Sequence, residues 1–593
     1  MRPNDMMKVL MPLGLLLGGM SVYAQSTSFT INTNLERKAI SPLIYGYNAY
    51  ADGTNRTGWE NQGGQASLQS LNLASRRLGG NSMTSYNWEN GVSNSGEDWC
   101  NSSNAAVSAV AGAGNPSTTA GLAYYAPGAA LVSFHDQSLA LNAYSLLQLP
   151  AAGKLPKDIV NLYPPGSCQG YDLWQSTAGP SNIDTARWLT IVNDKPASLG
   201  SLSTTPALSD DFVYLDEELN FLIQKYGNSQ TASGIKGYEL DNEPDLWHHW
   251  ADANNGSGTH PNLYPAFTTV ADVVQKNIVL ASTIKRMDSS AQTYGPAISG
   301  YLGLFSLWAV WDGTQSHQPA DWSIYNVEPF VSNLTGDRYR YNGMTMANAY
   351  LSAMKNASLQ ANQRLLDVFS FHYYPQASYT LTDRVQAARS LWDASYVEPS
   401  WITQTGNGFT DGRGLQIVTK LKQAINDFYP DTKLAITEYN FGGKDDVTGA
   451  IAQADALGIF GKQGVYLATY FGDAEGFIAS GFKIFRNYDG RMSSFPEISV
   501  QALASNNANG AVYAAVSAAD PSTLHIIAIN RLATAMTGNF QITNPVNFKT
   551  AQVWGVSGTT TAVTAQTGLS NIKSNKFSYR MPASSVLHFV LKP

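Results

Sequence analysis

The stretch GIKGYELDNEPDLW, residues 234–247, decides how we interpret the fold. It begins as a short apolar run and ends in three carboxylates at alternate positions, Asp241, Glu243 and Asp245. Pro244 restricts the backbone directly after Glu243 and cannot continue a strand ladder. We therefore interpret residues 235–241 as a buried strand that delivers acidic side chains to the edge of a sheet.

A second stretch of the same kind, LAITEYNFGG, occupies residues 434–443 and places Glu438 at the end of a strand over 433–438. From about residue 42 to 490, short apolar strands alternate with segments of helical periodicity. The helices are expected over 212–227, 266–287, 345–363, 412–428 and 449–462. About eight strand–helix units can be counted, which predicts an α/β fold, a (β/α)8 TIM barrel over residues 41–496. The loop 89–130 is rich in small residues and is expected to be an insertion on this barrel.

The pattern changes near residue 497, where short strands separated by turn residues replace the helical segments. We predict a small antiparallel β-sandwich over 497–593. Residues 25–40 contain an alternating strand without a helix of its own, so this N-terminal strand is expected to join the sandwich.

The composition limits the classes of function. The chain has 593 residues, a net charge of −7 and a charged fraction of only 14%. That length fits two or three domains, and the acidic balance excludes a nucleic-acid backbone as partner. Nothing in the sequence points to association, and we expect a monomer.

The N-terminus is typical of a signal peptide over residues 1–24. Arg2 and Lys8 precede the apolar run VLMPLGLLLGGM, and Ala24 provides a small-residue cleavage site. The run is too short to span a membrane comfortably, although an uncleaved anchor is the alternative. We therefore expect a secreted or periplasmic protein that is free of the membrane after cleavage.

Glu243 and Glu438 follow the fourth and seventh predicted barrel strands, where the active sites of such barrels lie. Two carboxylates in one cleft can divide the work of glycoside hydrolysis, one donating a proton and the other attacking carbon. Asn242, beside Glu243, offers a donor and an acceptor to a sugar hydroxyl. The alternative is that each glutamate is a solvated loop residue or a charge at a helix start.

Other side chains near strand ends are candidates for substrate binding: Asn81, Trp88, His372, Tyr373, Tyr439 and Tyr470, the last with Phe471 as a stacking platform. A structural role is the alternative for each of them, and we favour it for Trp88. His248, His249 and His260 lack the HExxH spacing of a zinc hydrolase, so we expect them in a substrate loop.

Two further features concern stability. Glu89, Glu97 and Asp98 offer hard oxygen ligands for a structural calcium ion, although acidic loops without metal are commoner. Cys100 and Cys168 are the only cysteines, and both lie in polar, loop-like sequence. They predict one disulfide in an oxidising compartment, with two unpaired buried thiols as the alternative.

Five motifs in order, RLGGNSMTSYNWENGVSNSGEDW, YELDNEPDLWHHW, FSFHYYP, ITEYNFGG and GFKIFRNYDG, resemble glycoside hydrolase family 44. The resemblance implies a retaining endo-β-1,4-glucanase or xyloglucanase that acts on β-glucan polysaccharide without a required cofactor. It implies that Glu243 is the acid/base and Glu438 the nucleophile, and it favours the calcium ion. The loops LWHHWADANNGSGTHP and ATYFGDAEG depart from the family pattern and leave the glucan preference open. A xylanase or mannanase, or a non-catalytic carbohydrate-binding protein, are the alternatives.

Overall fold

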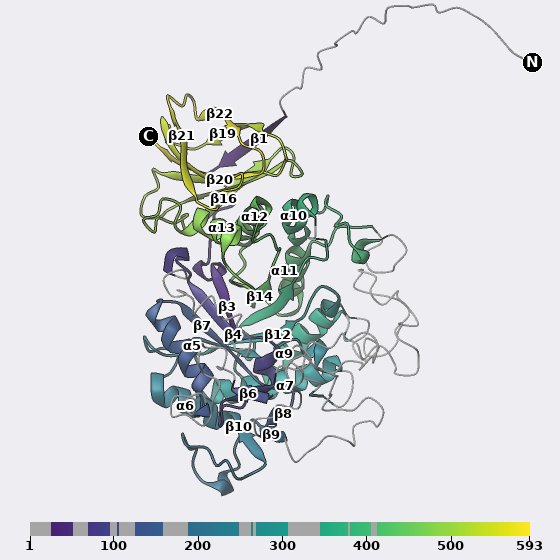
Figure 1. Ribbon diagram of the computed structural model, residues 1–593. Helices are drawn as coiled ribbons and strands as arrows, with labels where there is room; N and C mark the ends of the chain where they lie inside the picture. Colours follow the sequence, from purple (N-terminus) through teal and green to yellow (C-terminus); the bar gives the residue numbers. More distant parts are fainter. Residues whose placement is uncertain are drawn as a thin grey trace, which may run out of the picture.

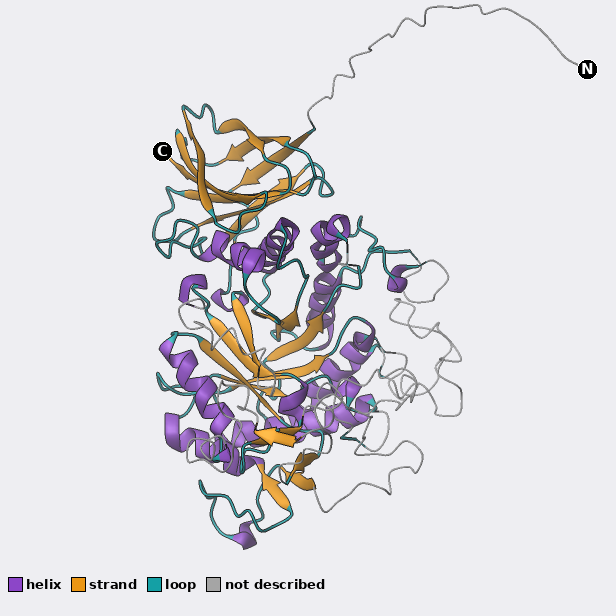
Figure 2. Ribbon diagram, in the orientation of Figure 1, coloured by secondary structure: helices purple, strands orange, loops and turns teal. Residues whose placement is uncertain are grey.

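The computed structural model describes residues 25–50, 69–94, 103–105, 125–157, 188–247, 263–264, 268–305, 307, 344–377, 380–404 and 412–593. These ranges form a helix-covered barrel and a separate β-domain (Figure 1, Figure 2). Across them, no helix is both long enough and apolar enough to cross a membrane.

Eight parallel strands close the barrel, which confirms the predicted fold. In chain order they are β3 (Gly46–Tyr50), β4 (Ser75–Gly79), β7 (Tyr144–Leu149), β11 (Gly237–Leu240), β12 (Gln292–Ile298), β13 (Val368–Tyr373), β14 (Lys433–Tyr439) and β15 (Leu467–Tyr470). The strands that precede Glu243 and carry Glu438 are therefore the fourth and the seventh.

Helices surround the barrel: α5 (Ala129–Ala140), α6 (Leu215–Tyr226), α7 (Val270–Met287), α9 (Met346–Ala361), α10 (Leu381–Ala387), α11 (Ile417–Phe428), α12 (Val447–Gln463) and α13 (Gly476–Arg486). α7 begins at a capping box, in which the Thr269 hydroxyl accepts from the Asp272 amide and the Asp272 carboxylate accepts in return. The helix expected from residue 412 begins only at Ile417, because Gln416 adopts a left-handed conformation with φ 49°. Residues 212–214 form strand β10 ahead of α6.

Small sheets decorate the loops of the barrel. β5 (Val92–Asn94) pairs with β6 (Ser103–Ala105) within the expected insertion, and β8 (Lys154–Pro156), β9 (Trp188–Val192) and β10 (Phe212–Tyr214) form a second sheet. The short helix α3 (Asn81–Thr84) follows β4 directly.

The β-domain is one curled sheet around its own apolar core, which includes Phe29, Val512, Ile526, Phe540 and Phe589. Its strands are β1 (Ser26–Asn32), β2 (Lys38–Ala39), β16 (Ile498–Ala504), β17 (Gly510–Val516), β18 (Leu524–Asn530), β19 (Met536–Thr543), β20 (Thr550–Ser557), β21 (Thr564–Ser570), β22 (Lys576–Met581) and β23 (Ser585–Lys592). The expected antiparallel pairing holds except where β1 runs parallel to β19, so the sheet is mixed. β1 lies between β16 and β19 and ties the N-terminal strand to the C-terminal domain.

The β-domain rests on α12 and α13 (Figure 1) through buried polar contacts. Arg531 Nη2 lies 2.5 Å from Asp455 of α12, whose other oxygen accepts a hydrogen bond from Tyr513. His588 Nδ1 lies 2.8 Å from the carbonyl of Ile484 in α13, so this nitrogen donates. His588 Nε2 then accepts from His525 Nδ1 at 2.9 Å. Because its Nε2 accepts a hydrogen bond, His588 is neutral in the folded protein.

This histidine pair makes thermal stability sensitive to acid. Burial lowers the pKa of His525 to about 4, against attraction by Asp520, and it also lowers the pKa of His588. The unfolded chain, with ordinary values near 6.5, binds more protons between these limits, so stability is lost as pH falls from about 6.5 to about 4. We expect His525→Gln to reduce the difference in Tm between pH 7 and pH 5 by about 1–2 °C, measured by calorimetry. An unaltered difference would contradict this role for the pair.

Candidate active site

Glu243 and Glu438 meet at the carboxyl ends of the barrel strands. One carboxylate oxygen of each and a ring nitrogen of His372 lie within 4.8 Å of one another. Both glutamates are buried apart from a small exposed fraction, 8% for Glu243 and 4% for Glu438. The two acidic stretches of the sequence therefore converge on one point.

The end of β11 explains why three carboxylates follow one strand. Asp241 is fully buried and accepts hydrogen bonds from the backbone amides of Ala151 at 2.5 Å and Ala152 at 2.9 Å. Burial raises its pKa to about 6, although these amides oppose the shift. Asp245 accepts from the backbone amide and the hydroxyl of Ser299. Asp241 and Asp245 thus anchor the backbone, and Glu243 is the one of the three that meets Glu438.

Strained backbone presents Glu243 to the cleft. Asp241 and Glu243 have left-handed conformations, with φ 70° and 42°. The Glu243 amide donates to the carbonyl of Ala297 at 2.9 Å, and Ala297 itself has φ 55°. Left-handed non-glycine residues are costly and concentrate at functional sites.

A β-bulge presents Glu438. The pairing of β13 with β14 joins Phe371 to Ile436 and then His372 to Glu438, so Thr437 is an extra residue. The Thr437 carbonyl accepts from Asn48 Nδ2 at 2.8 Å and from the Thr469 hydroxyl. Bulges re-aim side chains, and this one places Glu438 beside His372.

Arg77 of β4 is completely buried and connects Glu438 with Asn242, the residue next to Glu243. Its Nη1 donates to Glu438 Oε1 at 2.7 Å, and its Nη2 donates to Asn242 Oδ1 at 2.7 Å. Burial opposes the charge of Arg77, but Glu239 and Glu438 outweigh it and raise the pKa of Arg77. Asn242, predicted to contact substrate, thus accepts a hydrogen bond from Arg77 in the structure.

His372 and Tyr374 complete the contacts of the carboxylates. His372 Nδ1 lies 2.7 Å from Glu243 Oε1 and 3.5 Å from Glu438 Oε2. Burial lowers the affinity of His372 for a proton, but Glu438 and Glu243 outweigh burial and raise its pKa. The Tyr374 hydroxyl donates to Glu438 Oε2 at 2.6 Å.

Sequence reasoning missed Tyr374 and Arg77. Tyr374 directly follows the predicted His372 and Tyr373 in FSFHYYP. Arg77 lies in RRLGG, and a charged arginine within a predicted barrel strand was the feature that could have identified it.

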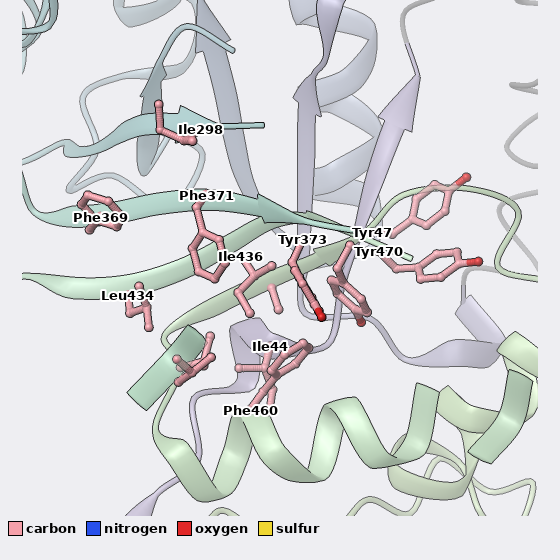
Figure 3. Packing of buried hydrophobic residues seen from close by; sticks show 14 of the residues in the cluster. Ile44, Tyr47, Ile298, Phe369, Phe371, Tyr373, Leu434, Ile436, Phe460 and Tyr470 are labelled. Carbon is pink, nitrogen blue, oxygen red and sulfur yellow. The ribbon is translucent and has the colours of Figure 1, made fainter. Parts of the chain in front are cut away.

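Four predicted substrate-binding residues lie in the core instead. Phe371 and Tyr373 of β13 point toward the helix layer (Figure 3). Because side chains alternate along a strand, His372 between them points the other way, toward Glu243 and Glu438. The Tyr373 hydroxyl donates to Glu398 at 3.0 Å. For the same reason Tyr439, next to Glu438, packs on Phe460 of α12.

Tyr470 is also buried and packs on Phe482, and Trp88 is fully buried with its indole donating to the Tyr214 carbonyl at 3.2 Å. These placements correct the substrate-binding assignment of Tyr373, Tyr439 and Tyr470. For Trp88, also a candidate for substrate binding, they agree with the structural role that the sequence favoured.

Asn81 is half-buried at the start of α3, directly beyond β4, so it lies at the end of the barrel that carries the site. Glu89 is buried, and its Oε2 has no hydrogen-bond partner among the described residues. Phe471, the predicted stacking partner of Tyr470, is half-buried, with its ring centroid 6.3 Å from that of Tyr374. The other predicted positions lie outside the described residues: Glu97, Asp98, Cys100, Cys168, His248, His249 and His260.

A closed (β/α)8 barrel with two glutamates meeting at the ends of strands four and seven is the architecture of a glycoside hydrolase. The model of glycoside hydrolase family 44 matches residues 92–377. The chain belongs to glycoside hydrolase family 44, a family of endoglucanases and xyloglucanases.

Individual relatives agree over nearly the whole chain. Endoglucanase A of Paenibacillus lautus is 37% identical over 588 residues, which cover 96% of this chain and 73% of that protein. The β-mannanase/endoglucanase A of Caldicellulosiruptor saccharolyticus is 34% identical over 93% of this chain, which spans 38% of that longer protein. The solved structure of a Paenibacillus polymyxa family 44 xyloglucanase with xyloglucan is 33% identical, with a TM-score of 0.78 over 96% of this chain and 100% of that one.

The adjacent tyrosines at the end of β13, Tyr373 and Tyr374, provide a matched test of the site. Tyr374→Phe removes a hydrogen bond to the charged Glu438, so we expect kcat/KM to fall about 10-fold or more in a hydrolysis assay. Tyr373→Phe removes a hydrogen bond to Glu398 in the helix layer and should lower Tm while kcat/KM stays within about twofold. Equal losses of kcat/KM in both variants would exclude the special role of Tyr374.

Proposed function

We propose that this protein is an exported, retaining endo-β-1,4-glucanase that hydrolyses xyloglucan or cellulosic glucans. The observation that carries the proposal is the approach of the Glu243 and Glu438 carboxylates within 4.8 Å. Retaining enzymes hold their two carboxyl groups about 5–5.5 Å apart, whereas inverting enzymes need about 6.5–9.5 Å to admit a water. Membership of family 44 supplies the class of substrate.

In the first step, protonated Glu243 donates its proton to the glycosidic oxygen while Glu438 attacks the anomeric carbon. The carbon–oxygen bond to the leaving sugar breaks, and an ester joins Glu438 to the retained glycosyl unit. Hydrogen bonds from Arg77 and Tyr374 fix the two oxygens of Glu438 for this attack. His372 Nδ1 forms a hydrogen bond with Oε1 of Glu243, the carboxyl group that donates the proton.

In the second step, Glu243 accepts a proton from water, and the resulting oxygen displaces Glu438 from the anomeric carbon. The product keeps its original configuration, and Glu243 is protonated again for the next cycle. Neither step calls for an organic cofactor.

The names of the relatives support the choice of substrate. The Paenibacillus polymyxa enzyme binds xyloglucan and the Paenibacillus lautus enzyme is an endoglucanase. Mannan is the second candidate, because the Caldicellulosiruptor saccharolyticus relative is also a β-mannanase. A purified panel of xyloglucan, cellulosic glucan, xylan and mannan, with products sized by chromatography, distinguishes these substrates.

The signal-like residues 1–24 support export to the periplasm or the medium, and the acidic balance supports a partner other than nucleic acid. We further propose a monomer in which a calcium ion stabilises the loop after β4. Glu89 and Glu218 fit such an ion, because Glu89 Oε2 and both carboxylate oxygens of Glu218 are buried without a hydrogen-bond partner among the described residues. Burial raises the pKa of both groups. Glu97 and Asp98 are the other proposed ligands, and the ion would supply charge compensation only.

The two glutamates should respond differently to substitution. Glu243→Gln is a poor proton donor, so we expect turnover of polysaccharide to fall about 10²–10⁴-fold. Turnover of an aryl glycoside with an activated leaving group, which needs no proton, should fall far less in the glycosylation step. Glu438→Gln should abolish hydrolysis of both substrates. Equal losses on the two substrates in Glu243→Gln, or near-normal activity in Glu438→Gln, would overturn the assigned roles.

Removal of calcium should lower stability. We expect a calcium chelator to lower Tm by about 1 °C for each kcal/mol of binding free energy lost in a chain of this length, and added Ca²⁺ to restore it. Glu218→Gln should remove the response to chelator, measured by calorimetry with and without Ca²⁺. A wild-type Tm that ignores the chelator would rule out the ion.

A further inference from the structure

We propose that Glu239 is a positioning residue of the hydrolytic site, which holds the Arg77 guanidinium and offsets its charge so that Glu438 stays a strong nucleophile. The inference rests on the proposed two-carboxylate function. Glu239 is completely buried in β11, and among the described residues its side chain is linked to the catalytic glutamates through Arg77.

Arg77 divides its donors among residues from three different strands. Its Nε donates to Glu239 Oε2 at 2.5 Å, while Nη1 donates to Glu438 and Nη2 to Asn242, at 2.7 Å each. Nη1 also donates to Asn48 Oδ1 at 3.0 Å. Because a guanidinium is planar, fixing Nε fixes the directions of both Nη groups. Glu239 therefore sets the orientation in which Arg77 meets the nucleophile and the residue before the acid.

Charge gives Glu239 a second effect. Without Glu239, the full positive charge of Arg77 would act on Glu438 in surroundings of low dielectric constant. A carboxylate stabilised in this way is a weaker nucleophile and a better leaving group. With Glu239 in place, Arg77 and Glu239 form a compensated pair, and the negative charge of Glu438 remains available for attack.

The cost of burying Glu239 argues that it is not kept for stability alone. Its second oxygen, Oε1, is buried and has no hydrogen-bond partner among the described residues. An unsatisfied carboxylate oxygen is expensive in a protein interior, and buried ion pairs are often no more stabilising than apolar residues. A role in tuning the site explains why a charged group occupies this position.

Glu239→Gln tests the charge while keeping the shape. The Gln carbonyl oxygen can still accept from Arg77 Nε, so the geometry is retained and the negative charge is lost. We expect the acidic limb of the kcat/KM profile to move to lower pH by about 1 unit, and kcat/KM at neutral pH to fall about 10-fold. On an aryl glycoside limited by hydrolysis of the glycosyl-enzyme ester, kcat should be maintained or should rise, because Glu438 leaves more readily.

Asp455→Asn is the matched control, because Asp455 is also a completely buried carboxylate 2.5 Å from a buried arginine, in this case Arg531 at the β-domain. It should lower Tm without moving the pH profile. If Glu239→Gln does not fold, as judged by circular dichroism, Glu239→Asp is the second variant. Its shorter side chain weakens the contact with Arg77 and should move the acidic limb in the same direction by a smaller amount.

A folded Glu239→Gln enzyme whose acidic limb coincides with that of the wild type would overturn the inference, whatever its activity. So would a folded Glu239→Asp enzyme that is slower at an unchanged profile, if the Gln variant does not fold. Failure of the proposed function is distinguishable, because in that case the wild type itself would hydrolyse none of the glycans in the panel.

Discussion

The hydrogen bonds of one buried arginine hold the catalytic end of this barrel together. Arg77 reaches from β4 to Glu438 of β14, to Asn242 beyond β11 and to Asn48 of β3. A guanidinium with no exposure to water must be paired with carboxylates and acceptors, or its charge would destabilise the fold. The need to pair the buried charge of Arg77 therefore also fixes the positions of Glu438 and of Asn242, the residue before Glu243.

Backbone irregularity at the strand ends complements this constraint. Left-handed residues after β11 and a bulge in β14 occur at the positions from which Glu243 and Glu438 approach each other. Asp241 supports the first irregularity by accepting backbone amide donors from the residues that follow β7. Some polar residues beside the catalytic glutamates, such as Asp241, thus stabilise the backbone that positions them.

The β-domain extends the same principle outside the barrel. Its contact with α12 includes the buried Asp455–Arg531 pair, and its contact with α13 includes a histidine pair. In both contacts the donor and the acceptor are defined: Arg531 donates to Asp455, and His588 donates to the carbonyl of Ile484. The domain is therefore attached to two of the helices next to β15 by interactions that fix its orientation.

The sequence by itself determined the barrel, the change to a β-domain near residue 497 and the strand ends at which Glu243 and Glu438 lie. These features follow from the local spacing of apolar residues along the chain. The sequence could not distinguish Tyr374, which reaches Glu438, from Tyr373, which packs in the core, because their directions depend on the register of β13 within the closed barrel. Nor could it identify Arg77 and Glu239 as partners, because residues far apart in the chain become neighbours only when the barrel closes. Contacts between strands, and the burial that gives charges their strength, exist only in the tertiary structure.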